Sequence, residues 1–158
     1  MNDRKHFIEM DAHYKGYRIV VVLQKFGYRC GYVLIPPYMD AYFEEAGADE
    51  YGNNQLVERL LVHGGITFDR HENTTDYLPE PGHWIGFDCA HCNDWHDWDA
   101  VAEHFGKDVA SRLRPYYRGW DTDEWDTDES HTWTVEEVAN ECKKLVDQLL
   151  ELTPDYVI

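Results

Sequence analysis

The feature that most constrains the fold is an apolar stripe near the C-terminus. Apolar residues recur every three or four positions from Val135 to Leu152, which is the spacing of one face of an α-helix. Thr134 and Glu137 have the spacing of a capping box, in which each side chain accepts a hydrogen bond from a backbone amide of the first turn. Pro154 follows the end of the pattern. We therefore expect a helix over 135–152 that buries this stripe against a sheet.

Two runs rich in β-branched and aromatic residues predict that sheet. Residues 17–23 (YRIVVVL) and 28–35 (YRCGYVLI) should form strands, joined by a turn at 24–27 and ended by the proline pair at 36–37. Because side chains alternate along a strand, one face of the second strand should carry every other residue. Those residues are Tyr28, Cys30, Tyr32 and Leu34.

Weaker patterns complete the expected fold. They predict short helices over 38–46 and 54–60, strands over 60–68 and 83–88, and a polar loop over 69–82. They also predict a helix that Asp97 caps, that Gly106 interrupts, and that resumes over 109–113. No repeat or linker divides the chain. We expect a single α+β domain over 1–158, with an antiparallel or mixed sheet of about four strands covered on one face by the later helices.

Composition narrows the classes of partner. The chain has 158 residues, a formal net charge of −17 and 43% hydrophobic residues, which fits a folded protein. Direct binding to nucleic acid is not expected, because a phosphate backbone would be repelled and no counterions released. No apolar run approaches the roughly 20 residues of a membrane span, and no signal peptide is recognisable. We expect a cytoplasmic protein without a membrane partner.

Chemically capable side chains concentrate in the middle of the chain. One expected strand holds a histidine before a glycine pair, His63-Gly64-Gly65, where glycine indicates a bulge or a close approach of another group. The next expected strand runs into four further candidates: Asp88, Cys89, His91 and Asp94. Burying such groups together costs free energy unless they are paired or coordinated. We therefore expect Asp88 and His91 to share a partly buried polar site with His63.

Several chemistries fit this set. A helical turn would gather Asp88, His91 and Asp94, which recur every three residues, and with His63 they would suit a divalent metal such as zinc or manganese. A histidine–aspartate hydrogen-bonded network without metal fits equally well. Asp88 would have a purely structural role if its carboxylate capped the following turn.

The four cysteines add two further hypotheses. Cys89 and Cys92 form a C-x-x-C pair, but a structural zinc site needs two more ligands, and the candidates Cys30, His96 and Cys142 are scattered. Cys89 could also act as a nucleophile with His63 or His91 as its base. Buried, inert thiols are the commoner explanation, above all for Cys142 on the apolar stripe of the last helix.

Two charged segments remain. Residues 121–129 are strongly acidic, with Trp120 directly before them and Trp125 among them. Segment 120–129 is therefore a candidate contact surface for a host protein. A solvated loop is the ordinary explanation of its charge, although two interleaved tryptophans are unusual for an inert loop. The basic residues Lys107, Arg112, Arg114 and Arg118 could bind a phosphorylated ligand or neutralise the acidic segment.

Three blocks give the chain a resemblance to a known family. The blocks are GYRCGYV at 27–33, HGGITF at 63–68 and WIGFDCAH at 84–91, and the pattern continues through Cys92-Asn93-Asp94. Together they resemble a family of small uncharacterised proteins of tailed bacteriophages, prophages and their hosts. The resemblance implies an accessory role in host cytoplasm but no settled activity, and the acidic segment departs from the pattern.

These observations favour one hypothesis over a second. The first is a pocket of His63, Asp88, Cys89, His91 and Asp94 that binds a small phosphorylated or nucleotide-like molecule, with metal-assisted hydrolysis as one outcome and simple binding as another. The second is an acidic inhibitor that mimics nucleic acid in a groove of a host protein, with segment 120–129 as its contact surface.

Overall fold

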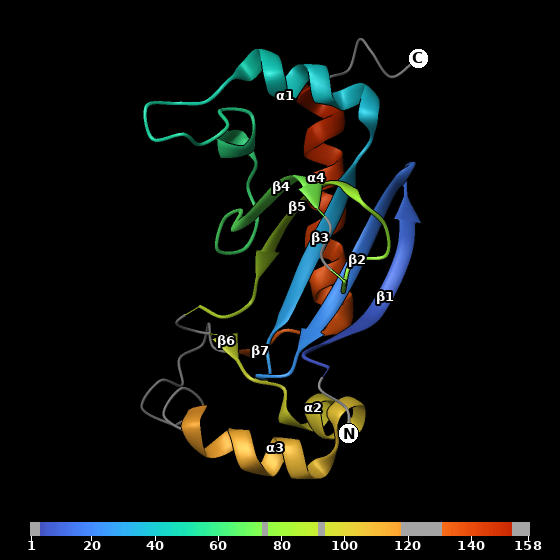
Figure 1. Cartoon of the computed structure of the whole chain (residues 1–158), viewed down its shortest axis with the longest axis vertical. Coiled ribbons are helices and arrows are strands. Elements are labelled where there is room, and N and C mark those ends of the chain that lie inside the picture. Colours follow the sequence, from blue (N-terminus) through green and yellow to red (C-terminus); the bar gives the residue numbers. More distant parts are fainter. Residues whose placement is uncertain (1–3, 74–75, 92–93, 118–130, 153–158) are drawn as a thin grey trace.

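One antiparallel sheet of five strands forms the centre of the structure (Figure 1). The structure is a computed structural model that describes residues 4–73, 76–91, 94–117 and 131–152. Its strands are β1 (His6–Tyr14), β2 (Tyr17–Gln24), β3 (Arg29–Ile35), β4 (Phe68–Asn73) and β5 (Gly82–Asp88). They lie in the order β1-β2-β3-β5-β4. The predicted α+β class, the β2–β3 hairpin and the strand near 83–88 are confirmed.

Both edges of the sheet differ from the prediction. β1 has no dense apolar run, since its side chains are only half-buried or exposed, and the sequence patterns did not indicate it. The strand expected over 60–68 is wrong. Gly64 and Gly65 have left-handed φ angles of +70° and +82°, and the Gly65 amide donates to the Val62 carbonyl at 2.9 Å, so the chain turns here. β4 begins only at Phe68 and occupies the first part of the expected loop over 69–82.

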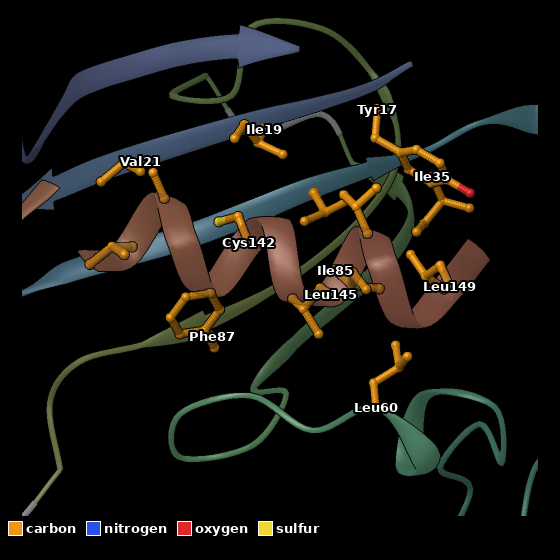
Figure 2. Packing of buried hydrophobic residues seen from close by; sticks show 14 of the residues in the cluster. Tyr17, Ile19, Val21, Ile35, Leu60, Ile85, Phe87, Cys142, Leu145 and Leu149 are labelled. Atoms are coloured by element: carbon orange, nitrogen blue, oxygen red, sulfur yellow. The ribbon is translucent and has the colours of Figure 1, made fainter. Parts of the chain in front are cut away.

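The helix α4 (Val135–Leu152) covers one face of the sheet (Figure 1). Its capping box forms as predicted: Thr134 N–H donates to Glu137 Oε1 at 3.1 Å, and Glu137 N–H donates to Thr134 Oγ1 at 3.2 Å. The predicted stripe packs against side chains of β2, β3 and β5 (Figure 2). Its fully buried members are Val138, Ala139, Cys142, Leu145, Val146 and Leu149.

The opposite face of the sheet has a smaller core. Tyr32 and Trp84 lie there with Leu78, a residue of the β4–β5 connection, and Trp84 Nε1 donates to the Glu80 carbonyl at 3.0 Å. Ile85 and Phe87 of β5 pack on the α4 side instead. The alternation predicted for β3 is therefore confirmed, and the side chains of β5 alternate in the same way.

Shorter helices lie beyond the two ends of the sheet (Figure 1). At one end are a 3₁₀ turn, Pro37–Met39, the helix α1 (Asp40–Ala46) and a second 3₁₀ turn, Val57–Arg59. At the other end are α2 (Trp98–Phe105) and α3 (Lys107–Leu113), separated by Gly106 as predicted. Asp97 caps α2, because its Oδ1 accepts the Ala100 amide at 3.0 Å. A short parallel pair, β6 (Asp94–Trp95) and β7 (His131–Thr132), joins this end to α4.

A buried ion-pair network ties these parts together. Arg29 on β3 is 5% exposed, and two of its nitrogens donate to the Glu9 carboxylate on β1 at 2.7 and 2.9 Å. Its third nitrogen donates to Asp97 at 2.7 Å and to the Trp133 carbonyl at 2.8 Å. Arg29 thereby fixes the starts of α2 and α4 to the sheet. In the part of the chain that the structure describes, no helix is long and apolar enough to cross a membrane.

Candidate metal centre

His63 lies in the turn that replaces the expected strand. Its amide donates to Glu141 Oε1 on α4 at 2.9 Å, and its ring packs against Trp133 with 4.2 Å between ring centroids. The sequence patterns indicated neither of these neighbours. Glu141 could have been noticed, because helical spacing puts it between Val138 and Leu145 on the buried face of α4. These contacts hold His63 at the edge of the sheet, with its imidazole three-quarters buried.

Asp94, the first residue of β6, is the central acceptor of the site. Its side chain is 2% exposed, and its two carboxylate oxygens lie 2.9 and 2.8 Å from His63 Nε2. Its Oδ2 also accepts the His91 amide at 2.9 Å. Since an ionised carboxylate only accepts hydrogen bonds, Nε2 of His63 carries the proton when no metal is bound. A metal ion would replace that proton.

His91 brings a second imidazole to Asp94. Its Nδ1 lies 3.5 Å from Asp94 Oδ2 and 3.6 Å from Asp88 Oδ1, which is too far for a good hydrogen bond. This nitrogen is buried and has no hydrogen-bond partner among the described residues. The ring lies directly on Gly64, where a Cβ atom would come 2.6 Å from Nδ1. The expected close approach at the glycine pair thus occurs at Gly64, whereas a Cβ on Gly65 would meet no atom within 4 Å.

Asp88 lies at the rim of the site rather than at its centre. Its Oδ1 accepts the Ala90 amide at 3.1 Å, and its Oδ2 accepts the Thr67 hydroxyl at 3.1 Å. The carboxylate therefore caps the turn after β5, which is the structural role considered for it. It nevertheless faces His91 Nδ1, so it remains within reach of a ligand bound beside that ring.

Three of the four expected metal ligands converge. His63, His91 and Asp94 each offer a donor atom, and these atoms all lie within 4.8 Å of one another. Around tetrahedral zinc, bonds of about 2.0–2.1 Å place neighbouring donor atoms about 3.3 Å apart. The separations of 2.8 Å from His63 Nε2 to Asp94 Oδ2 and 3.5 Å from His91 Nδ1 to the same oxygen bracket that value. The donor atoms of the two imidazoles lie within 4.8 Å of each other.

Cys89 lies beside this group but in a different environment. It is 2% exposed, and burial, followed by the charge of Asp94, raises the pKa of its thiol far above the usual value. Since a nucleophilic cysteine needs a lowered pKa, the surroundings do not favour the nucleophile hypothesis. Cys30 and Cys142 are also buried free thiols, and burial raises the pKa of each to about 12.

Some expectations concern segments outside the described residues. Cys92, the second cysteine of the C-x-x-C pair, is one of them, and so are Arg118 and the acidic segment 120–129. The zinc hypothesis based on that pair and the host-protein contact at that segment stay predictions.

Comparison with known proteins gives no relative. No family model, curated protein or solved structure matches the chain.

Proposed function

We propose that this protein binds a divalent metal ion, zinc above all, through His63, His91 and Asp94. The observation that carries the proposal is the buried Nδ1 atom of His91, which has no hydrogen-bond partner in the described part of the chain and lies beside the carboxylate that already holds His63. A hydrogen-bonded network without metal would leave this nitrogen unsatisfied, at a cost of about 1–3 kcal/mol. A metal ion would satisfy it.

The donor types favour zinc. Two imidazoles and one carboxylate suit zinc better than magnesium or calcium, which prefer oxygen donors alone. Three protein ligands also leave the fourth tetrahedral position open, as in catalytic rather than structural zinc sites. His91, with a side chain 38% exposed, leaves solvent access to this position.

The open position suggests the class of ligand. Without an ion, the two carboxylates of Asp88 and Asp94 would repel an anion, so the phosphorylated or nucleotide-like ligand depends on the metal. When bound, zinc would supply a Lewis acid for a phosphate oxygen and an activated water for hydrolysis. Asp88 at the rim would accept a proton from that water. With the resemblance noted in the sequence, we place this role in a phage or prophage accessory protein.

Calorimetric titration of metal-free protein with zinc tests the proposal. Asp94→Asn should bind one equivalent of zinc fewer than wild type, because the amide keeps the shape of the carboxylate but not its charge. Asp88→Asn should keep that equivalent. His13→Gln, which changes an exposed histidine on β1, is the matched control and should also keep it. Equal zinc binding by wild type and Asp94→Asn would refute the assignment.

The ligand is tested separately on zinc-loaded protein. Inorganic phosphate and a panel of nucleotides should bind wild type and fail to bind Asp94→Asn, and a chromogenic phosphate ester reports hydrolysis. If hydrolysis occurs, Asp88→Asn should slow it while zinc stays bound. If the protein binds zinc but none of these anions, the proposed metal centre stands and the proposed phosphorylated ligand is rejected.

A further inference from the structure

A second group of histidine and aspartate side chains lies where α1 meets the sheet. His83, at the start of β5, is 4% exposed, and the edge of its ring contacts Phe43 of α1 at 4.9 Å between centroids. Its Nε2 lies 2.8 Å from Asp69 Oδ1 on β4, and its Nδ1 lies 3.5 Å from Asp40 Oδ1 on α1. Each nitrogen of one buried imidazole therefore faces a carboxylate.

The two contacts of His83 are not equivalent. A neutral imidazole carries one N–H, and the short contact with Asp69 assigns that proton to Nε2, because the carboxylate can only accept. Nδ1 then directs a lone pair toward Asp40 Oδ1, which is another acceptor. Both atoms are buried, and neither has a hydrogen-bond partner among the residues described. Two buried acceptors that face each other repel unless a cation lies between them.

We propose that Nδ1 of His83 and Oδ1 of Asp40 hold a second divalent cation, zinc above all. Their separation of 3.5 Å is close to the distance of about 3.3 Å between neighbouring donors around tetrahedral zinc. Asp69 accepts the other ring N–H, as carboxylates commonly do behind a metal-bound histidine, and so orients the ring. The Asp40 side chain is 47% exposed, so water can complete the coordination.

His71 packs on this site without joining the ligand pair. Asp69, His71 and His83 do offer donor atoms within 4.8 Å of one another. However, the rings of His71 and His83 are stacked, with centroids 3.9 Å apart and planes 19° apart. The in-plane lone pairs of stacked rings run side by side and do not converge on one ion. His71 is therefore a packing partner of His83.

The second site shares no residue with the centre at His63, so the two proposals can fail separately. In metal-free protein titrated with zinc, Asp40→Asn should lose one bound equivalent relative to its parent, whether the parent is wild type or Asp94→Asn. Asp69→Asn should weaken that equivalent roughly 10- to 100-fold, the usual effect of removing such an orienting group. His71→Phe, which keeps the ring stack, and Asp108→Asn, an exposed carboxylate on α3, should leave it unchanged.

Nitrogen NMR of the imidazole of His83 gives an independent readout. We expect a proton on Nε2 alone in metal-free protein and a shift of the Nδ1 resonance when zinc is added. The alternative is an imidazolium that bridges the two carboxylates. Protons on both nitrogens that persist in excess zinc, or an Asp40→Asn variant that binds as much zinc as its parent, would overturn the proposal.

Discussion

Replacing Gly64 by alanine tests the link between the turn and the metal centre. Gly64 and Gly65 both have left-handed φ angles, +70° and +82°, so alanine at either position should cost about 1–2 kcal/mol of folding stability. Only at Gly64 would the new methyl group collide with a neighbour, because the His91 ring lies on it. Gly65→Ala is thus a matched control that has the backbone strain without the collision.

The two variants should differ in their affinity for zinc. Gly64→Ala must push the His91 ring aside and remove one of three ligands, so its zinc affinity should fall at least about tenfold, or about 1.4 kcal/mol. Gly65→Ala should bind zinc like wild type. Urea unfolding of metal-free protein gives the stability loss, and calorimetry gives the affinity. Equal zinc affinities in the two variants would show that His91 does not bind the ion at the position beside Gly64.

Three further predictions concern the fold. Thr134→Ala should lower the free energy of unfolding, measured with urea, by about 1 kcal/mol. Burial opposes ionisation of Glu137, but the Thr134 amide and His131 lower the pKa of Glu137 below its usual 4.5. The stability that this carboxylate contributes should therefore be present above that pH and disappear as the pH falls through the lowered pKa. Arg29→Met should lose about 3–5 kcal/mol because Glu9 stays buried without its partner, and Glu9→Gln in the same chain should restore part of the loss. Alkylation with peptide mapping should find that three thiols react slowly until the protein unfolds, those of Cys30, Cys89 and Cys142. Rapid reaction of these thiols in the folded protein would contradict their burial.

The elements that could be predicted are those in which the buried apolar residues recur at regular spacing. α4 has a helical stripe and a capping box, and β2, β3 and β5 have dense or alternating apolar residues, so all four appear where expected. β1 and β4 lie at the edges of the sheet and carry many polar side chains. An edge strand needs burial on fewer sides, so its sequence resembles that of a loop.

The sequence predicted some residues of the candidate site and only part of its geometry. Histidine and aspartate near two strand ends and a glycine pair indicated a polar site, and His63, His91 and Asp94 do meet. The sequence could not show that His63 lies in a turn, because that depends on left-handed φ angles at both glycines. Nor could it separate the central role of Asp94 from the capping role of Asp88, since both are aspartates at similar spacing from His91.

X-ray absorption at the zinc edge identifies the atoms that bind zinc at the centre of His63, His91 and Asp94. The sample is the Asp40→Asn variant loaded with one equivalent of zinc, which isolates the centre at His63 from the second site. We expect nitrogen and oxygen neighbours at about 2.0–2.1 Å, with the multiple-scattering signature of two imidazoles and no sulfur. A sulfur shell at about 2.3 Å would instead place the metal on cysteine and contradict the assignment of His63, His91 and Asp94 as the ligands.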